Sequence, residues 1–229
     1  MRKLIWLGAP ALTMLTLLLL ALLLAGCGGG GGGGGSGGGV PASVVAAPTP
    51  VATPVASVPR DCTVDLWGDS ILAGQGTRGQ LAQTPAQYIQ TKRPAYAVVD
   101  DSVSGSGANA SESRLHAREL TARFVVLEWG VNDPAQGYTD IAGVLTRDVA
   151  HVRALGHTPV LTGIDTAFNN PAIIAQPLAV AQATGAAYAD WPSVQGGTVD
   201  GLHPDQTTSD AFAQKIVDVL DKLAPECMK

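Results

Sequence analysis

The chain has 229 residues, of which 46% are hydrophobic, 5% aromatic and 14% charged, and its formal net charge is −5. This composition is typical of a domain with an aliphatic core and excludes a chain that is disordered throughout. The charged residues before position 61 are Arg2, Lys3 and Arg60, so the rest of the chain carries 11 basic and 19 acidic residues, a net charge of −8. Such an acidic balance argues against nucleic acid as a partner.

The first 27 residues have the pattern of an export signal. Arg2 and Lys3 precede an uncharged apolar run over residues 4–25, and small residues then lead to Cys27. Residues 24–27, Leu-Ala-Gly-Cys, resemble the bacterial lipobox, in which the cysteine is acylated and becomes the mature N-terminus. The alternative is a plain signal peptide or a permanent membrane anchor with an incidental cysteine. We expect lipidation of Cys27 and an exported protein, lipid-anchored to the bacterial cell envelope.

Residues 28–60 have the composition of a linker. Glycines fill positions 28–39 except for Ser36, and a stretch rich in Pro, Ala, Val and Thr follows as far as Pro59. The glycine part is typical of a flexible coil and the proline part of a stiffer, extended spacer. We therefore expect a disordered linker that holds the domain near a membrane without pressing the domain into it.

Residues 61–229 alternate short apolar runs with helical periods. Runs that predict buried parallel strands cover residues 63–67, 96–99, 124–129, 159–162 and 186–189. Helices are predicted from Thr84-Pro85 to about Lys92, over residues 141–155 before Gly156, and over residues 212–223. This order predicts an α/β fold, a three-layer α/β/α sandwich with a five-stranded, parallel, doubly wound sheet. Ligands bind such sheets beyond the carboxyl ends of the strands.

Four short motifs lie at those strand ends or just before the last helix. They are Gly68-Asp69-Ser70 after the first strand, Gly105-Ser106-Gly107 after the second, Asn132-Asp133 after the third, and Asp200-Gly201-Leu202-His203 near the C-terminus. Each motif alone is weak, but four in this order resemble the SGNH or GDSL hydrolase family over most of residues 63–224. The resemblance implies a flavodoxin-like SGNH hydrolase fold and a serine ester hydrolase.

The residue chemistry agrees with a catalytic triad of Ser70, Asp200 and His203. A serine hydroxyl becomes a good nucleophile only when a nearby base accepts its proton, and His203 is the candidate base. Asp200, three residues earlier, is close enough to accept the other imidazole proton and fix the tautomer. The other histidines, at positions 116, 151 and 157, are expected to be structural because their segments read as helix or helix end.

The resemblance assigns the oxyanion hole to the backbone N–H groups of Ser70 and Gly105 and to the side-chain amide of Asn132. Gly107 is the competing glycine. Glycine suits this role because a side chain would block the approach of substrate to the backbone.

Two acidic residues near these motifs receive other interpretations. We expect Asp69 to be a structural carboxylate that accepts backbone N–H groups rather than a second catalytic acid. Glu128 is unusual in an apolar run; we expect its side chain to reach solvent at the end of the sheet, with a substrate contact as the alternative. Asp100, where the family often has asparagine, affects support of the glycine loop and leaves the triad unchanged.

Cys62 and Cys227 lie at the two ends of the domain, in a chain whose signal directs it to an oxidising compartment. We predict a disulfide between them. No cofactor and no metal site are predicted, because neither a zinc cluster nor a phosphate-binding glycine loop with lysine is present.

The favoured function is therefore an esterase acting through an acyl-enzyme on a small acyl ester, an acetylated glycan or a lysolipid, as a monomer. A catalytically silent glycan-binding module on the same fold is the alternative. A flavodoxin-like cofactor binder is disfavoured because Asp69 stands where a phosphate would have to approach. The acyl group, the alcohol and the membrane face of the anchor are left open.

Overall fold

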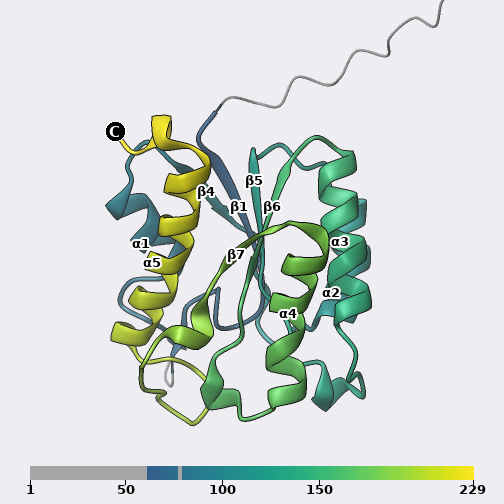
Figure 1. Cartoon of the computed structure of the whole chain (residues 1–229). Coiled ribbons are helices and arrows are strands. Elements are labelled where there is room, and N and C mark those ends of the chain that lie inside the picture. The colour runs from purple at the N-terminus through teal and green to yellow at the C-terminus, as the bar shows by residue number, and fades with distance from the viewer. Residues whose placement is uncertain (1–60, 77–78) are drawn as a thin grey trace, which may run out of the picture. The chain divides into compact units, whose positions relative to one another are not determined.

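The computed structural model describes residues 61–76 and 79–229 (Figure 1). The predicted signal segment, Cys27 and the linker lie outside the described residues. Figure 1 shows a central sheet with helices on both faces. The domain is therefore a three-layer α/β/α sandwich, as the sequence predicts.

The main sheet has five parallel strands in the order β4-β1-β5-β6-β7. Its strands are β1 (Thr63–Trp67), β4 (Ala97–Asp100), β5 (Phe124–Leu127), β6 (Thr158–Thr162) and β7 (Ala187–Ala189). The chain starts on β1 inside the sheet, moves to the β4 edge, and then crosses back to build the other half through β5, β6 and β7. This is the predicted doubly wound arrangement, and it creates a switch point between β1 and β5.

A two-stranded antiparallel hairpin lies outside the main sheet. It pairs β2 (Gln75–Gly76) with β3 (Gly79–Gln80) soon after the turn that carries Ser70.

The strands differ in how deeply they are buried. All four residues of β5 are buried, because β5 has strand neighbours on both sides and helices on both faces. β4 is an edge strand, and Val99 on it is 53% exposed. The apolar run that predicts β4 thus marks a strand with one neighbour rather than a fully buried one.

Helices α1 (Pro85–Lys92) and α5 (Gln206–Leu223) cover one face of the sheet, and α2 (Ala108–Ala117), α3 (Ala142–Ala154) and α4 (Pro171–Thr184) cover the other (Figure 1). Short 3₁₀ helices, η1 to η4, cover Pro134–Gln136, Thr166–Phe168, Trp191–Ser193 and Pro225–Cys227. Apolar side chains from the sheet and both helical layers form one core. The helices also fix the loops that begin or end beside the candidate site.

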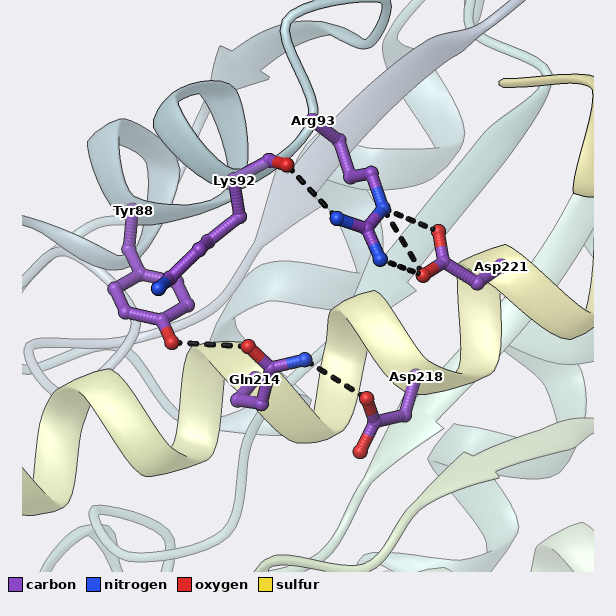
Figure 2. A network of polar contacts seen from close by, with 6 residues as sticks. All are labelled: Tyr88, Lys92, Arg93, Gln214, Asp218 and Asp221. Atoms are coloured by element: carbon purple, nitrogen blue, oxygen red, sulfur yellow. Dashed lines mark hydrogen bonds and ion pairs between the residues drawn. The ribbon is translucent and has the colours of Figure 1, made fainter. Parts of the chain in front are cut away.

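The start of α1 and its contact with α5 follow directly from side-chain chemistry. Thr84 and Gln87 form a capping box, which satisfies donors at the first turn of α1. Figure 2 shows Arg93, at the end of α1, donating from Nε to both carboxylate oxygens of Asp221 on α5, each at 3.0 Å. The Tyr88 hydroxyl donates to Gln214 Oε1 at 2.9 Å. These bonds fasten α1 to α5, the helix that directly follows the segment carrying His203.

Cys62 and Cys227 form the predicted disulfide; their Cα atoms lie 5.7 Å apart, and the two residues are 165 positions apart in sequence. The bond joins the start of β1 to the chain after α5. Closing so long a loop stabilises a fold by up to about 4 to 5 kcal/mol, because it restricts the unfolded chain. Among the helices of the described residues, none has the length and apolarity needed to cross a membrane.

Candidate active site

The four sequence motifs converge at the carboxyl end of the sheet. Ser70 follows β1, Gly105 follows β4 and Asn132 follows β5, so three loops meet where three neighbouring strands end. The fourth motif lies in the irregular segment before α5. A bridge between Thr198 and Pro204 closes that segment. The sheet and α5 thus bring residues 133 positions apart in sequence into contact.

Ser70, His203 and Asp200 form one hydrogen-bonded chain. His203 Nε2 lies 2.9 Å from Ser70 Oγ, and His203 Nδ1 lies 2.7 Å from Asp200 Oδ2. An ionised carboxylate only accepts hydrogen bonds, so Nδ1 carries the imidazole proton and Nε2 is free to accept one from the serine hydroxyl. The predicted triad residues therefore have the geometry that activates a serine nucleophile.

Asp200 is held in its ionised form although it lies near solvent. The hydrogen bond from the His203 side chain lowers its pKa to about 2, and the backbone N–H groups of His203 and Leu202 contribute further. Those two N–H groups donate to Asp200 Oδ1 at 2.8 and 3.0 Å. The Asp200 side chain is 37% exposed, compared with 15% for that of His203. Local hydrogen bonds, rather than burial, fix this carboxylate.

The turn that carries Ser70 is organised by Asp69. Asp69 is fully buried and its Oδ1 accepts the backbone N–H of Ile71 at 2.8 Å. The backbone carbonyl oxygens of Asp69 and Ser70 accept from Ala73 and Gln75 at 3.0 and 2.8 Å. The predicted structural role of Asp69 agrees with these contacts, and the tight turn presents the Ser70 hydroxyl to His203.

The expectation for Glu128 is wrong. Its side chain is 1% exposed and lies beneath the Ser70 turn, where Oε2 accepts the backbone N–H of Asp69 at 3.0 Å. The Glu128 N–H donates to Trp67 O at 2.8 Å and so extends the pairing of β1 with β5 by one residue. Because the chain of β1 turns back over this position, a residue at the end of β5 faces the turn and not solvent.

The structure separates the two candidate glycines. Gly105 has φ +79°, a conformation that glycine adopts without strain, and a Cβ there would meet no atom within 4 Å. A Cβ on Gly107 would lie 2.7 Å from Oδ2 of Asp133, whose carboxylate accepts the N–H of Ala108 at 2.9 Å. Gly107 is needed for packing at the start of α2. Gly105 leaves open space beside its backbone.

Asn132 lies beside the turn that carries Ser70, and its side-chain amide has hydrogen-bond partners in this structure. Asn132 Nδ2 donates to Asp69 Oδ2 and to the backbone oxygen of Ser106, each at 3.0 Å. The amide has two protons, so an oxyanion would have to share one of them. The Asn132 side chain is therefore fixed between the turn after β1 and the loop after β4.

The other three histidines have structural partners, as expected. His116 Nε2 lies 2.9 Å from Asp148 Oδ1, and the rings of His116 and His151 stack with centroids 4.0 Å apart. His157 Nδ1 lies 2.6 Å from the backbone oxygen of Ala122.

One group of metal-ligating residue types occurs in the described part of the chain, on α2 and α3. The ligand atoms of Glu112, His116 and Asp148 lie within 4.8 Å of one another. However, Arg147 donates to both oxygens of Glu112, at 2.5 and 2.9 Å, and brings a positive charge to the cluster. These contacts favour an ion-pair network between the two helices over a cation site.

No protein-family model and no curated protein sequence matches the chain. Solved structures do match. TesA is 26% identical, with a TM-score of 0.60 over 70% of this chain and 99% of that chain. The psychrotrophic esterase EstA from Pseudoalteromonas sp., in a structure inhibited by monoethylphosphonate, is 20% identical, with a TM-score of 0.59 over 72% of this chain and 100% of that chain.

An acetylxylan esterase from Geobacillus stearothermophilus, Axe2, is 16% identical, with a TM-score of 0.56 over 69% of this chain and 93% of that chain. A GDSL-like lipase from Bacteroides thetaiotaomicron also matches, at 18% identity and a TM-score of 0.54 over 71% of this chain and 89% of that chain. The chain is therefore similar in fold to GDSL-type esterases and lipases, and its four sequence motifs meet at one end of the sheet.

Proposed function

We propose that the protein is a carboxylic ester hydrolase whose nucleophile is Ser70, and the observation that carries the proposal is the hydrogen-bonded chain from Ser70 through His203 to Asp200. In the first half-reaction, Ser70 Oγ attacks the carbonyl carbon of the ester as His203 Nε2 takes the hydroxyl proton. The C–O bond to the alcohol then breaks, and His203 gives its proton to the departing oxygen. The alcohol leaves, and the acyl group stays on Ser70 as an ester.

Water completes the cycle in the second half-reaction. His203 accepts a proton from water, whose oxygen attacks the acyl carbon, and the same proton returns to Ser70 Oγ as the acyl-enzyme breaks down to a carboxylic acid. The imidazole is positively charged at each tetrahedral intermediate, and the ionised Asp200 beside Nδ1 stabilises that charge. Because the Asp200 pKa is about 2, this carboxylate is available throughout the neutral pH range.

The negative charge on the substrate oxygen needs donors on the opposite side of Ser70. We assign them to the backbone N–H groups of Ser70 and Gly105, for which the described residues 61–76 and 79–229 supply no acceptor. The Asn132 amide is the third donor. One of its two protons, which Asp69 Oδ2 and Ser106 O accept in the resting state, would be shared with the oxyanion. Each such donor typically lowers the barrier by about 2.7 to 4 kcal/mol.

We propose a short acyl group, such as acetyl on an envelope glycan, as the substrate class. The support is the openness of the acid–base side, where Asp200 is 37% exposed in its side chain. Among the described residues of the neighbouring loops, the large hydrophobic side chains that are exposed are Val103, Tyr138 and Val199. A long acyl chain requires more buried apolar contact than these provide.

The test is hydrolysis of a p-nitrophenyl ester series, from acetate to long chains, by residues 61–229 and by Ser70→Ala. We expect the highest kcat/KM on acetate or butyrate and loss of turnover in the variant. A preference for long chains would redirect the substrate class to lysolipids. Equal rates in both proteins would exclude Ser70 as nucleophile, and inactivity of both would favour a binding module.

We further propose that the protein is exported and anchored through lipid on Cys27, on the strength of the lipobox-like segment alone. Expression of the full chain in a bacterium with labelled palmitate tests this directly. Label and detergent-dependent solubility are expected for the wild type, and both should vanish for Cys27→Ser. If the wild type carried no label, the remaining interpretations of the N-terminal segment would be a plain signal peptide or a permanent membrane anchor.

A further inference from the structure

Two carboxyl groups outside the triad, those of Glu128 and Asp69, lie at the turn that carries the proposed nucleophile. Glu128 is 1% exposed and Asp69, the residue before Ser70, is 0% exposed. Burying two acids costs free energy unless hydrogen bonds or a shared proton compensate, so the contacts of these two side chains need an explanation. The triad uses neither of them.

The first contact fixes the backbone that presents Ser70. Glu128 Oε2 accepts the Asp69 N–H at 3.0 Å. Gly68 makes room for this approach, because a Cβ there would lie 2.6 Å from the same oxygen and 2.7 Å from Leu72 Cβ. The N–H of Ser70, one of the proposed oxyanion donors, belongs to the next peptide unit along the chain.

The second contact reaches Asn132 through Asp69. Asp69 Oδ2 accepts from Asn132 Nδ2 at 3.0 Å while Asp69 Oδ1 accepts from Ile71 N at 2.8 Å. Both Asp69 oxygens thus receive N–H donors, which favours the ionised form of Asp69 over that of Glu128. Glu128 therefore bonds to Asp69, and Asp69 in turn precedes the Ser70 N–H in the chain and bonds to the Asn132 amide.

The pair carries one proton, and that proton belongs on Glu128. Two adjacent buried carboxyl groups do not ionise together at neutral pH. Burial raises the pKa of Glu128 well above its ordinary value, and the charge of Asp69 raises it further. Burial also raises the pKa of Asp69, to about 6, against the lowering effects of Ile71 N–H, Glu128, His203 and Asn132. The titratable groups that act on this pair are thus the two acids themselves and His203.

We propose that Glu128 is a positioning residue: as a neutral carboxylic acid beneath the turn, it holds Asp69, and through Asp69 it holds the Ser70 N–H and the Asn132 amide where an oxyanion forms. This proposal rests on the proposed ester hydrolase function. It concerns kcat more than KM, because oxyanion donors act on the transition state rather than on substrate binding.

Two substitutions separate the chemical role from simple packing. Glu128→Gln keeps an oxygen for the Asp69 N–H and supplies an N–H₂ group where the acid has its proton, so we expect kcat within about threefold of the wild type. Glu128→Met keeps the approximate volume but loses the hydrogen bond to the Asp69 N–H. The displaced donors should then lower kcat by up to about 10²-fold with KM little changed. Asp65→Asn, which also replaces a buried acid by an amide but on β1 away from the site, is the matched control and should leave kcat unchanged.

The pH profile gives a readout that a packing role would not move. At alkaline pH the wild type should lose kcat as Glu128 ionises beside Asp69, whereas Glu128→Gln cannot ionise and should keep its kcat. If kcat fell equally at alkaline pH in the wild type and in Glu128→Gln, the proton on Glu128 would have no role in catalysis. Full activity of Glu128→Met would remove the positioning role altogether.

Crystal structures of the two variants test positioning without turnover. Asn132 Nδ2 should stay about 3.0 Å from Asp69 Oδ2 in Glu128→Gln and move away in Glu128→Met. An unmoved Asn132 in Glu128→Met overturns the proposal even if the protein hydrolyses no ester. Failure of the ester hydrolase function itself has a different signature, equal hydrolysis by the wild type and Ser70→Ala.

Discussion

Two carboxyl groups close to Ser70, those of Asp200 and Asp69, lie in opposite environments. On one side, Asp200 is 37% exposed in its side chain, and hydrogen bonds from His203 lower its pKa to about 2. On the other side, Asp69 is fully buried and its pKa is raised to about 6, mainly by burial. The difference shows that hydrogen-bond donors and desolvation, not residue type, set the charge state of each carboxyl group.

The two sides therefore suit different tasks. A carboxylate that stays ionised near solvent can stabilise a positive imidazolium in each half-reaction. A buried pair with a single negative charge is a rigid support, because Glu128 Oε2 and both carboxylate oxygens of Asp69 accept hydrogen bonds from the backbone or from Asn132. Substitutions on either side of Ser70 should thus have separable effects.

The largest effect should come from breaking the acid–base side at His203. His203→Ala removes the group that accepts the Ser70 proton, so kcat should fall by about 10⁴-fold or more. The thermal unfolding midpoint should change little, because His203 lies in an irregular segment. Steady-state kinetics on p-nitrophenyl acetate and a thermal scan measure the two quantities. A variant that retains a tenth of the wild-type kcat would show that His203 is not the base.

Asp200→Asn weakens the same side without removing the base. The amide is neutral and can turn its N–H₂ toward Nδ1, which disfavours the required tautomer, so kcat should fall by about 10³-fold. The partial exposure of Asp200 allows water to replace some of the lost interaction. Asp205→Asn, which affects only the N-cap of α5, is a suitable control and should keep nearly all of the activity. Similar kinetics for the two variants would argue against a triad.

Asn132→Ala breaks the buried side at its contact with substrate. Loss of one oxyanion donor should lower kcat by about 10²- to 10³-fold and leave KM nearly unchanged. The measurement is a Michaelis–Menten series on a short-chain ester. If the loss appears in KM instead, Asn132 binds the ground state and the resting bonds to Asp69 and Ser106 are not shared with an oxyanion.

Asp65→Asn tests the effect of burial on a carboxyl group that has no part in the proposed catalysis. Burial raises the pKa of Asp65 from 3.8 to about 6. The folded protein then binds this proton more tightly than the unfolded chain, so the contribution to stability is full below about pH 4 and is lost as pH rises through about 6. At pH 8 the ionised side chain costs at most about 3 kcal/mol. Denaturant unfolding should show stabilisation of the variant at pH 8 and little change at pH 4; the opposite pattern would mean that the ionised form is the one stabilised by folding.

The sequence predicts the fold well where local signals are strong. The interior strands read as continuous apolar runs, and Thr84-Pro85 marks the start of α1 by its capping chemistry. By contrast, α4 goes unrecognised, because an apolar stretch with an internal proline, Pro177, has no clear amphipathic period. Motif order is informative about the site because parallel strands end at one edge of the sheet.

The sequence pattern did not predict the burial of Glu128. Its position at the end of an apolar run suggests a side chain exposed to solvent. The turn after β1 instead folds over this side chain, and only the three-dimensional structure shows this. The usable signal was Gly68, since a glycine next to a nucleophile motif indicates a close approach by another group. The two resting partners of Asn132 were likewise invisible, because they come from loops after two other strands.

The central claim, an activated Ser70 nucleophile, is tested most directly by covalent labelling with a p-nitrophenyl alkylphosphonate, followed by mass spectrometry of the intact protein and of its peptides. The account predicts one adduct per chain, on Ser70 in the peptide that contains Gly68-Asp69-Ser70, with loss of esterase activity in proportion to labelling. Ser70→Ala should take no adduct, and His203→Ala should react far more slowly. An adduct on another residue, or equal labelling of Ser70→Ala, would contradict the account.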